Sequence, residues 1–286
     1  MIFDPFGDFE ARGYLRNVQR LRDPAEVKAL EHRHFLKNLD LAFTALASLE
    51  QVAYEHVLAT HKTLFGGVYP WAGLDRAAIA PSLAISRGKR GDLFAHPQDI
   101  RRAAEYGLRR GQDVAFMASD PGEVLGTLAY AHPFLDGNGR TIMVVHTELA
   151  TRAGIHIDWA GTDKQDYLAA LTQELDRPGK GELDSFLKPF VGPAVPRDQA
   201  SATLARCAAS DQTPRRPMGI ERPGRRDDHF TNTFPVIFSK FPRKIFSRTS
   251  FARLSESNMR RVSRMYPVPF SGSNGQSEAN TTFSIG

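Results

Sequence analysis

Two apolar segments that flank one polar loop set the strongest limit on how this chain can fold. Residues 122–131 precede the loop and residues 141–150 follow it, and both are apolar enough to be buried helices. The nine residues between them, 132–140, read His-Pro-Phe-Leu-Asp-Gly-Asn-Gly-Arg. A packing connector needs only a plain turn, so this density of polar residues and glycine indicates a functional loop.

The residue types in this loop suit phosphate chemistry. Gly137 and Gly139 have no side chain, so their backbone N–H groups can approach an anion closely, and the helix that follows adds its positive dipole end. Arg140 can hold phosphate oxygens with a fixed fork of donors, and Asp136 is an oxygen ligand of the kind that Mg²⁺ takes together with substrate phosphates. His132 can accept a proton near neutral pH. The loop therefore predicts a site for chemistry at phosphorus.

The same nine residues resemble the signature of the Fic (Fic/Doc) family of protein nucleotidyltransferases at every position. Residues 64–73, Leu-Phe-Gly-Gly-Val-Tyr-Pro-Trp-Ala-Gly, resemble an upstream block of that family, and residues 95–97 fit the end of its flap. We place the resemblance over residues 36–192. It implies transfer of AMP from ATP to a Ser, Thr or Tyr hydroxyl of a target protein, with release of pyrophosphate.

The resemblance also assigns roles within the loop. His132 is expected to be the general base that deprotonates the target hydroxyl, and Asp136 to hold the Mg²⁺ that bridges the phosphates of the substrate ATP. The expected nucleotide-binding residues are an anchor that fixes the loop to the core, three residues of an anion-binding nest, and a contact to the leaving diphosphate. In that order they are Phe134, Gly137, Asn138, Gly139 and Arg140.

One position departs from the family pattern. A second Arg, which contacts the γ-phosphate, is expected three residues after Arg140, but this chain has Met143 there. The loss predicts weakened or altered nucleotide use, and makes a different nucleotide or a phosphocholine-type donor more credible. The inhibitory Ser/Thr-x-x-x-Glu-Gly/Asn pattern of the family is also absent, so any restraint of this kind would come from a separate antitoxin-like partner.

Two other functions stay open. One is phosphotransfer from a nucleotide, as in the Doc branch, against which Gly137 and Gly139 argue because they keep the anion site open for the diphosphate. The other is a catalytically weakened Fic fold that acts as a binding module. Met143 favours the binding module, and the intact His132, Asp136 and Asn138 oppose it.

Charge and composition limit the classes of partner and the cellular location that we expect. The net charge is +5, but residues 191–286 carry 15 basic and 7 acidic residues, which leaves 22 and 25 for residues 1–190. The body is therefore slightly acidic, and we expect no nucleic-acid partner. The single cysteine, Cys207, excludes an intramolecular disulfide. The chain starts without a basic and apolar leader and has no long apolar run, so we expect a cytoplasmic protein, with delivery into a host or target cell as the alternative.

Helical periodicity predicts an all-α, Fic-type helical core with a short β-hairpin flap and a disordered basic C-terminal tail. We divide the chain into an N-terminal arm at 1–35, a Fic domain at 36–192 and a tail of low order at 193–286. Helices are expected at these positions: two within 24–65, then 97–118, 121–132, 138–153, 163–175 and 182–190. The segment 78–95 has weak strand character around a basic turn. In the family context it is the flap that engages the target protein by strand addition.

The C-terminal tail differs from the rest of the chain in amino-acid composition. Residues 197–229 are broken by proline and rich in arginine, which is typical of disorder. Residues 230–264 carry six phenylalanines among basic residues. We interpret this stretch as a solvated extension, with a partner-, membrane- or translocation-directed segment as the alternative, and expect no second catalytic site there.

Overall fold

The computed structural model describes residues 16–79, 81 and 93–210. Within these ranges the fold is a bundle of helices around two central ones, α7 (Pro121–Ala131) and α8 (Asn138–Arg152). Nearly every residue of α7 is buried, and α8 is buried along most of its length. This arrangement confirms the two buried helices expected on either side of the polar loop.

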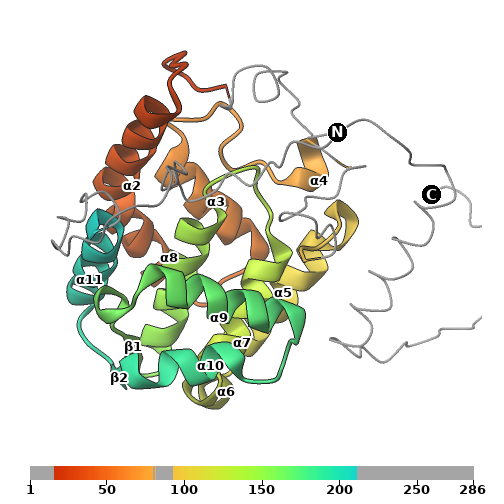
Figure 1. The fold of residues 1–286 in the computed structure, drawn as a ribbon, viewed down its shortest axis with the longest axis vertical. Helices are drawn as coiled ribbons and strands as arrows, with labels where there is room; N and C mark the ends of the chain where they lie inside the picture. Colours follow the sequence, from red (N-terminus) through yellow and green to blue (C-terminus); the bar gives the residue numbers. More distant parts are fainter. Residues whose placement is uncertain (1–15, 80, 82–92, 211–286) are drawn as a thin grey trace, which may run out of the picture.

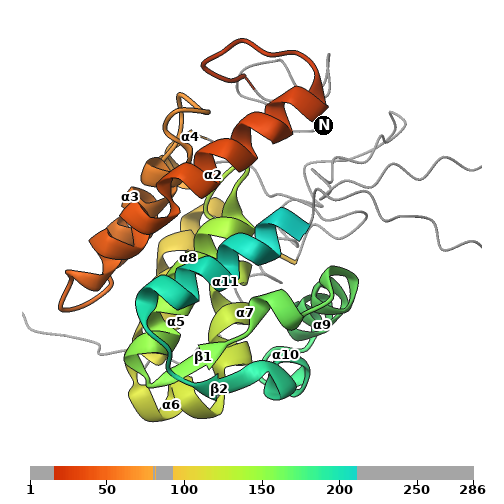
Figure 2. The ribbon, with the colours of Figure 1, turned by 90° about the vertical axis from the view of Figure 1, so that its left-hand side faces the viewer.

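Two N-terminal helices cover one side of α8 (Figures 1 and 2). Helix α2 (Pro24–Ala47) begins where the Asp23 side chain accepts a hydrogen bond from the backbone N–H of Ala25, and Pro24 fits the first turn, where no backbone donor is needed. Helix α3 (Tyr54–Phe65) ends at Gly66. Because α2 runs without a break through residue 36, the expected boundary between an arm and a domain falls inside a helix of the packed body.

The other side of the bundle is built from shorter helices. Helix α5 (Ile100–Gln112) packs along α7, and α9 (Lys164–Asp176) and α10 (Glu182–Leu187) pack against α7 and each other. The single helix expected over 97–118 is divided into a 3-10 turn (Pro97–Asp99), α5 and α6 (Val114–Ser119). The division lies at Asp113, whose backbone is extended and whose side chain caps α6 by accepting from the N–H of Phe116.

The only sheet in the described residues has two short antiparallel strands. Strand β1 (Ile155–Ile157) pairs with β2 (Val191–Pro193), with His156 opposite Gly192. Between them lie the 3-10 turn Trp159–Gly161, α9, α10 and a second 3-10 turn, Lys188–Phe190. The pairing closes this C-terminal part of the core over α8.

A helix follows β2 where disorder was expected. Helix α11 (Arg197–Ser210) lies along α2, as Figure 2 shows, and buries Ala200 and Leu204. The expectation of disorder from residue 197 is therefore wrong for this segment. The rest of the tail, including the phenylalanine-rich stretch 230–264, lies outside the described residues.

The flap expectation is tested only at its ends. Ala78 and Ile79 belong to the short helix α4 (Arg76–Ile79) and not to a strand, and Leu93 and Phe94 form a bend. The middle of the segment, residue 80 and residues 82–92, lies outside the description.

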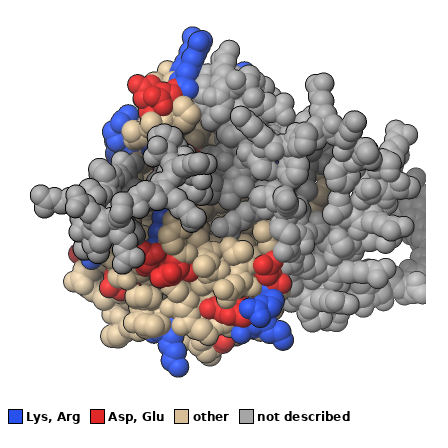
Figure 3. All heavy atoms as spheres, viewed as in Figure 1, with Lys and Arg blue, Asp and Glu red and all other residues tan. Residues whose placement is uncertain are grey.

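Basic and acidic side chains are interspersed among neutral ones on the visible part of the face in Figure 3. No helix among the described residues is both long and apolar enough to cross a bilayer.

Candidate active site

The polar loop begins at a strained residue. His132 ends α7 with φ 41°, a left-handed conformation that is uncommon for residues other than glycine. Its imidazole stacks on the ring of Phe94, with the ring centroids 3.9 Å apart. Strain of this kind persists only where the surroundings hold it, and such places are enriched in functional sites.

Arg76 holds this conformation. Its Nε donates to the carbonyl of His132 at 2.8 Å and its backbone N–H donates to the carbonyl of Pro133 at 2.7 Å. Its Nη2 donates to the carbonyl of Ala95 at 2.9 Å, so one buried guanidinium joins the loop to the segment that carries Phe94. Burial lowers the pKa of Arg76 to about 10, which still leaves the group charged at neutral pH.

The far half of the loop rests on His61. Its ring stacks on Phe134 with centroids 3.7 Å apart. Its Nδ1 accepts from the N–H of Gly73 at 2.9 Å, which leaves Nε2 to donate to the carbonyl of Asp136 at 3.1 Å. Burial lowers the pKa of His61 to about 3, so the ring stays neutral and keeps this arrangement.

Two of the expected nucleotide-binding residues close the loop upon itself. The side chain of Asn138 accepts from the N–H of Phe134 and donates to the carbonyl of the same residue, each at 2.8 Å. Phe134 is fully buried. Both side chains therefore shape the loop from within, and the backbone N–H of Asn138 remains at the start of α8.

The two glycines of the loop differ in their surroundings. Gly137 caps α8 with φ 77°, and a Cβ there would lie 2.8 Å from the ring of Phe65. A Cβ on Gly139, one residue into the exposed start of α8, would meet nothing within 4 Å. The first N–H groups of a helix have no partner within it, so the start of α8 offers backbone donors beside an open space.

A charged cluster lies beside this helix start. Nη2 of Arg140 donates to Oε2 of Glu31 at 3.0 Å, and the guanidinium lies over the ring of Phe65 at 4.7 Å. Glu31 also accepts a hydrogen bond from the hydroxyl of Tyr69. Burial, and then the charge of Glu31, raise the pKa of Tyr69 well above its ordinary value, so this hydroxyl remains a donor.

Asp136 has the character of a cation ligand. Its Oδ1 accepts from the N–H of Gly137 at 2.6 Å. Burial first, and the charge of Glu31 second, raise its pKa to about 7. A divalent cation at this carboxylate would displace the proton and supply the missing positive charge. The described residues contain no group of three or more His, Cys, Asp or Glu that could hold a metal.

The structure thus brings all seven expected site residues into one loop and the first turn of α8. It adds three residues that the sequence did not single out, Glu31, His61 and Arg76, which lie 101, 71 and 56 positions before His132. The local sequence around these residues is typical of ordinary helices. The one hint in the sequence was that His61 and Arg76 lie close to residues 64–73, the block that resembles the Fic family.

Similarity to known sequences covers the same part of the chain. The model of the Fic/DOC family matches residues 49–150. Protein adenylyltransferase VbhT of Bartonella schoenbuchensis is 31% identical over 176 residues, which cover 58% of this chain and 35% of VbhT. The protein y4lH of Sinorhizobium fredii, named a probable protein adenylyltransferase, is 31% identical over 127 residues, which cover 41% of this chain and 62% of y4lH. The chain spans less than two thirds of the length of either relative.

Solved structures show the same fold at lower sequence identity. The N-terminal Fic domain of a VirB-translocated Bep effector from Bartonella quintana has a TM-score of 0.54 and 21% identity, over 64% of this chain and 90% of that one. BepC from Bartonella tribocorum, with bound AMPPNP, has a TM-score of 0.53 and 17% identity, over 65% of this chain and 96% of that one.

Proposed function

Because residues 49–150 match the model of the Fic/DOC family, we propose that the chain transfers AMP from ATP to a hydroxyl group of a target protein. The observation that carries this proposal is the loop 132–140. Its nine residues contain the strained His132, the half-buried carboxylate of Asp136 and the N-terminus of α8. The relatives named as adenylyltransferases support the reaction, and the solved relative with AMPPNP supports ATP as the nucleotide.

In the proposed reaction His132 takes the proton from the target hydroxyl. The hydroxyl oxygen attacks the α-phosphorus of ATP, a P–O bond forms, and the bond to the diphosphate breaks with release of pyrophosphate. Arg76 and Phe94 hold His132 in place for this step. Fixed orientation of this kind lowers the entropic part of a barrier.

The start of α8 is proposed to bind the phosphates. The backbone N–H groups of Asn138 and Gly139 and the guanidinium of Arg140 are donors directed to negative charge. Asp136 is proposed to hold Mg²⁺, which when bound neutralises charge on the phosphates. Met143 is half-buried and packs against the core, so this turn of α8 adds no second arginine.

The acceptor is proposed to reach His132 along the segment 78–95, whose last residues join the loop through Arg76 and Phe94. The Bep proteins of similar fold are VirB-translocated effectors, which supports a role as a delivered effector, with a toxin acting in its own cell as the alternative. A separate inhibitory partner and a membrane or translocation contact of the tail remain parts of this proposal.

The test is incubation of the purified protein with α-³²P-ATP, Mg²⁺ and cell lysate, beside a His132→Ala control. We expect label on a lysate protein or on the enzyme itself, and none with the control. General-base catalysis contributes about 10²–10⁴-fold, so any residual label should be near background.

The alternatives have distinct outcomes in the same experiment. Label from γ-³²P-ATP and none from α-³²P-ATP would establish phosphotransfer, as in the Doc branch. Absence of label from ATP, GTP, CTP and UTP, with an effect on cells that survives His132→Ala, would establish a binding module. Met143 is the residue that favours the binding module, since it leaves one phosphate contact fewer.

A further inference from the structure

Glu31 is a buried acid that reaches the loop from a distant helix. It lies in the second turn of α2 with 5% of its surface exposed, and its partner Arg140 is 109 positions further along the chain. Acids are almost never buried without a specific partner. Both carboxylate oxygens of Glu31 are engaged, one by Arg140 and the other by the Tyr69 hydroxyl.

This arrangement fixes Arg140 on two sides. One edge of the guanidinium is held by Glu31 at 3.0 Å, and one face is covered by the ring of Phe65 at 4.7 Å. Arginine has five N–H donors. Among the described residues, Glu31 is the one acceptor that is hydrogen-bonded to Arg140. The other N–H groups of Arg140 are therefore left for a ligand at the start of α8.

The exposed fractions of the two side chains bear on whether Glu31 supports phosphate binding by Arg140 or competes with it. The side chain of Arg140 is 25% exposed and that of Glu31 is 7% exposed. Arg140 is therefore the member of the pair that a phosphate can reach, whereas the Glu31 carboxylate is almost fully enclosed. The Tyr69 hydroxyl holds that carboxylate in place.

We propose that Glu31 is a positioning residue of the phosphate site, which acts by holding the guanidinium of Arg140 so that its remaining donors meet the diphosphate part of the nucleotide. The inference rests on the proposed function, and it deepens it by naming a residue on α2 that the loop sequence does not contain. Glu31 touches neither the substrate nor the reacting atoms, so its effect should appear in nucleotide binding.

The test compares Glu31→Gln with the wild-type full-length chain. We expect the KM for ATP and the Kd for inorganic diphosphate each to rise about tenfold, the factor that 1.4 kcal/mol produces in a binding constant. We expect kcat at saturating ATP to change by less than about threefold, because His132 and its supports are untouched. Glu26→Gln is the matched control, since it makes the same change on the exposed side of α2.

A double-mutant cycle shows whether Glu31 acts through Arg140. In an Arg140→Gln background, Glu31→Gln should change the Kd for diphosphate no further, because the group that it positions is gone. If the Glu31→Gln chain does not fold, Tyr69→Phe replaces it. Loss of this hydroxyl releases one side of the carboxylate and should raise the KM for ATP in the same direction by a smaller factor.

Several results would overturn the inference. An unchanged Kd would make Glu31 a purely structural partner. A lower KM or a higher rate would show that Glu31 competes with phosphate for Arg140. A wild-type chain that binds no diphosphate would also overturn it. Diphosphate binding that responds to Glu31→Gln, without transfer of label from ATP, would leave the inference standing and defeat only the proposed reaction.

Discussion

At the scale of single residues, the two glycines of the loop have different roles, one in folding and the other in the proposed function. Gly137 has a left-handed backbone, and a Cβ there would collide with Phe65. Gly139 has an ordinary helical backbone and no neighbour within 4 Å of an added Cβ. The fold therefore needs the first glycine, and the open space above the second is the place where we expect phosphate to lie.

We predict that Gly139→Ala gives a folded but inactive protein. The melting temperature should stay the same or rise slightly, because alanine is favoured over glycine in a helix by about 0.5–1 kcal/mol. Label transfer from α-³²P-ATP should fall by at least tenfold, since the methyl group occupies the phosphate position. Gly137→Ala should lose stability and activity together. Full activity in Gly139→Ala would show that phosphate lies elsewhere.

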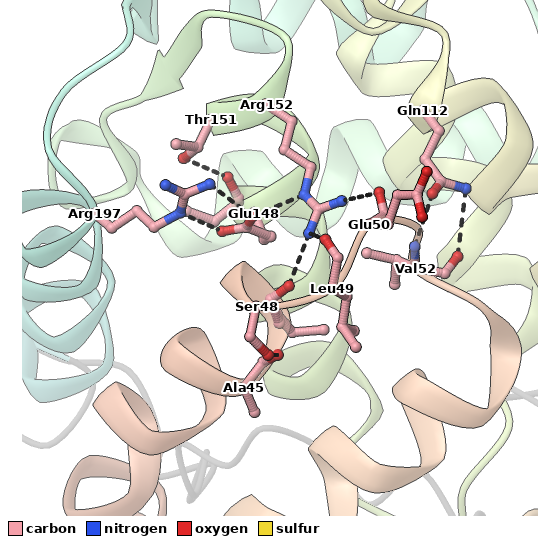
Figure 4. Close-up of polar contacts among 12 residues, drawn as sticks. Ala45, Ser48, Leu49, Glu50, Val52, Gln112, Glu148, Thr151, Arg152 and Arg197 are labelled. Atoms are coloured by element: carbon pink, nitrogen blue, oxygen red, sulfur yellow. Dashed lines mark hydrogen bonds and ion pairs between the residues drawn. The ribbon is translucent and has the colours of Figure 1, made fainter.

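At the scale of elements, one buried acid ties three helices together. Glu148 of α8 is fully buried and contacts Arg152 at 2.8 Å and Arg197 of α11 at 2.9 and 3.0 Å, as Figure 4 shows. Arg152 in turn donates to the carbonyl of Leu46 in the last turn of α2 and to those of Leu49 and Glu50 in the segment that follows. Helix α11 is therefore joined to the core by a partner about 50 positions away.

We predict that Arg197→Gln loosens α11 and lowers the free energy of unfolding by about 1.5–2 kcal/mol, which is the lower part of the range for hydrogen bonds to charged groups. The lower part applies because the Arg197 side chain is 46% exposed. Urea unfolding measures the change. Arg177→Gln is the matched control, because it breaks a surface pair with Glu182 and should shift stability by less than 0.5 kcal/mol. Equal effects of both substitutions would contradict the account.

These elements also show what a sequence can reveal. The helices α2, α3, α7 and α8 carry periodic apolar residues over ten or more positions. The expected bounds of α7 and α8 agree with the observed ones to within one residue, and α2 and α3 are the two helices expected within 24–65. Helix α11 was missed because the contacts that it makes, the ion pair with Glu148 and the packing along α2, join segments far apart in the chain. Strands β1 and β2 have three residues each and are defined by pairing across 33 intervening positions.

At the scale of the whole molecule, the candidate site is assembled from segments far apart in the sequence. The loop carries the proposed catalytic and phosphate-binding residues, and the residues that hold it come from α2, α3 and α4, at Glu31, His61 and Arg76. The loop residues were predictable because nine neighbouring positions carry the pattern. Their supports were not, because contacts over 56 to 109 positions are properties of the packed bundle.

The same packing makes the whole fold sensitive to acid through its buried histidines. His146 is fully buried, its Nε2 donates to the carbonyl of Pro121 at 2.8 Å, and burial lowers its pKa to about 4. Burial likewise lowers the pKa of His61 to about 3. Below about pH 6.5 both rings stay neutral in the folded chain, whereas in the unfolded chain they take up a proton. Their contribution to stability is therefore complete above pH 6.5 and is lost as the pH falls towards 4.

We predict that His146→Gln, which keeps a donor for Pro121 but does not titrate, is least stable relative to wild type at neutral pH. Between pH 7.5 and pH 4 the difference in unfolding free energy should shift in favour of the variant by about 2–3 kcal/mol. The comparison with wild type is needed because burial raises the pKa of Asp136 to about 7 and that of Asp184 to about 6, and these groups act in the opposite direction. Urea unfolding at several pH values measures the shift, and parallel curves for the two proteins would show that His146 takes up no proton on unfolding.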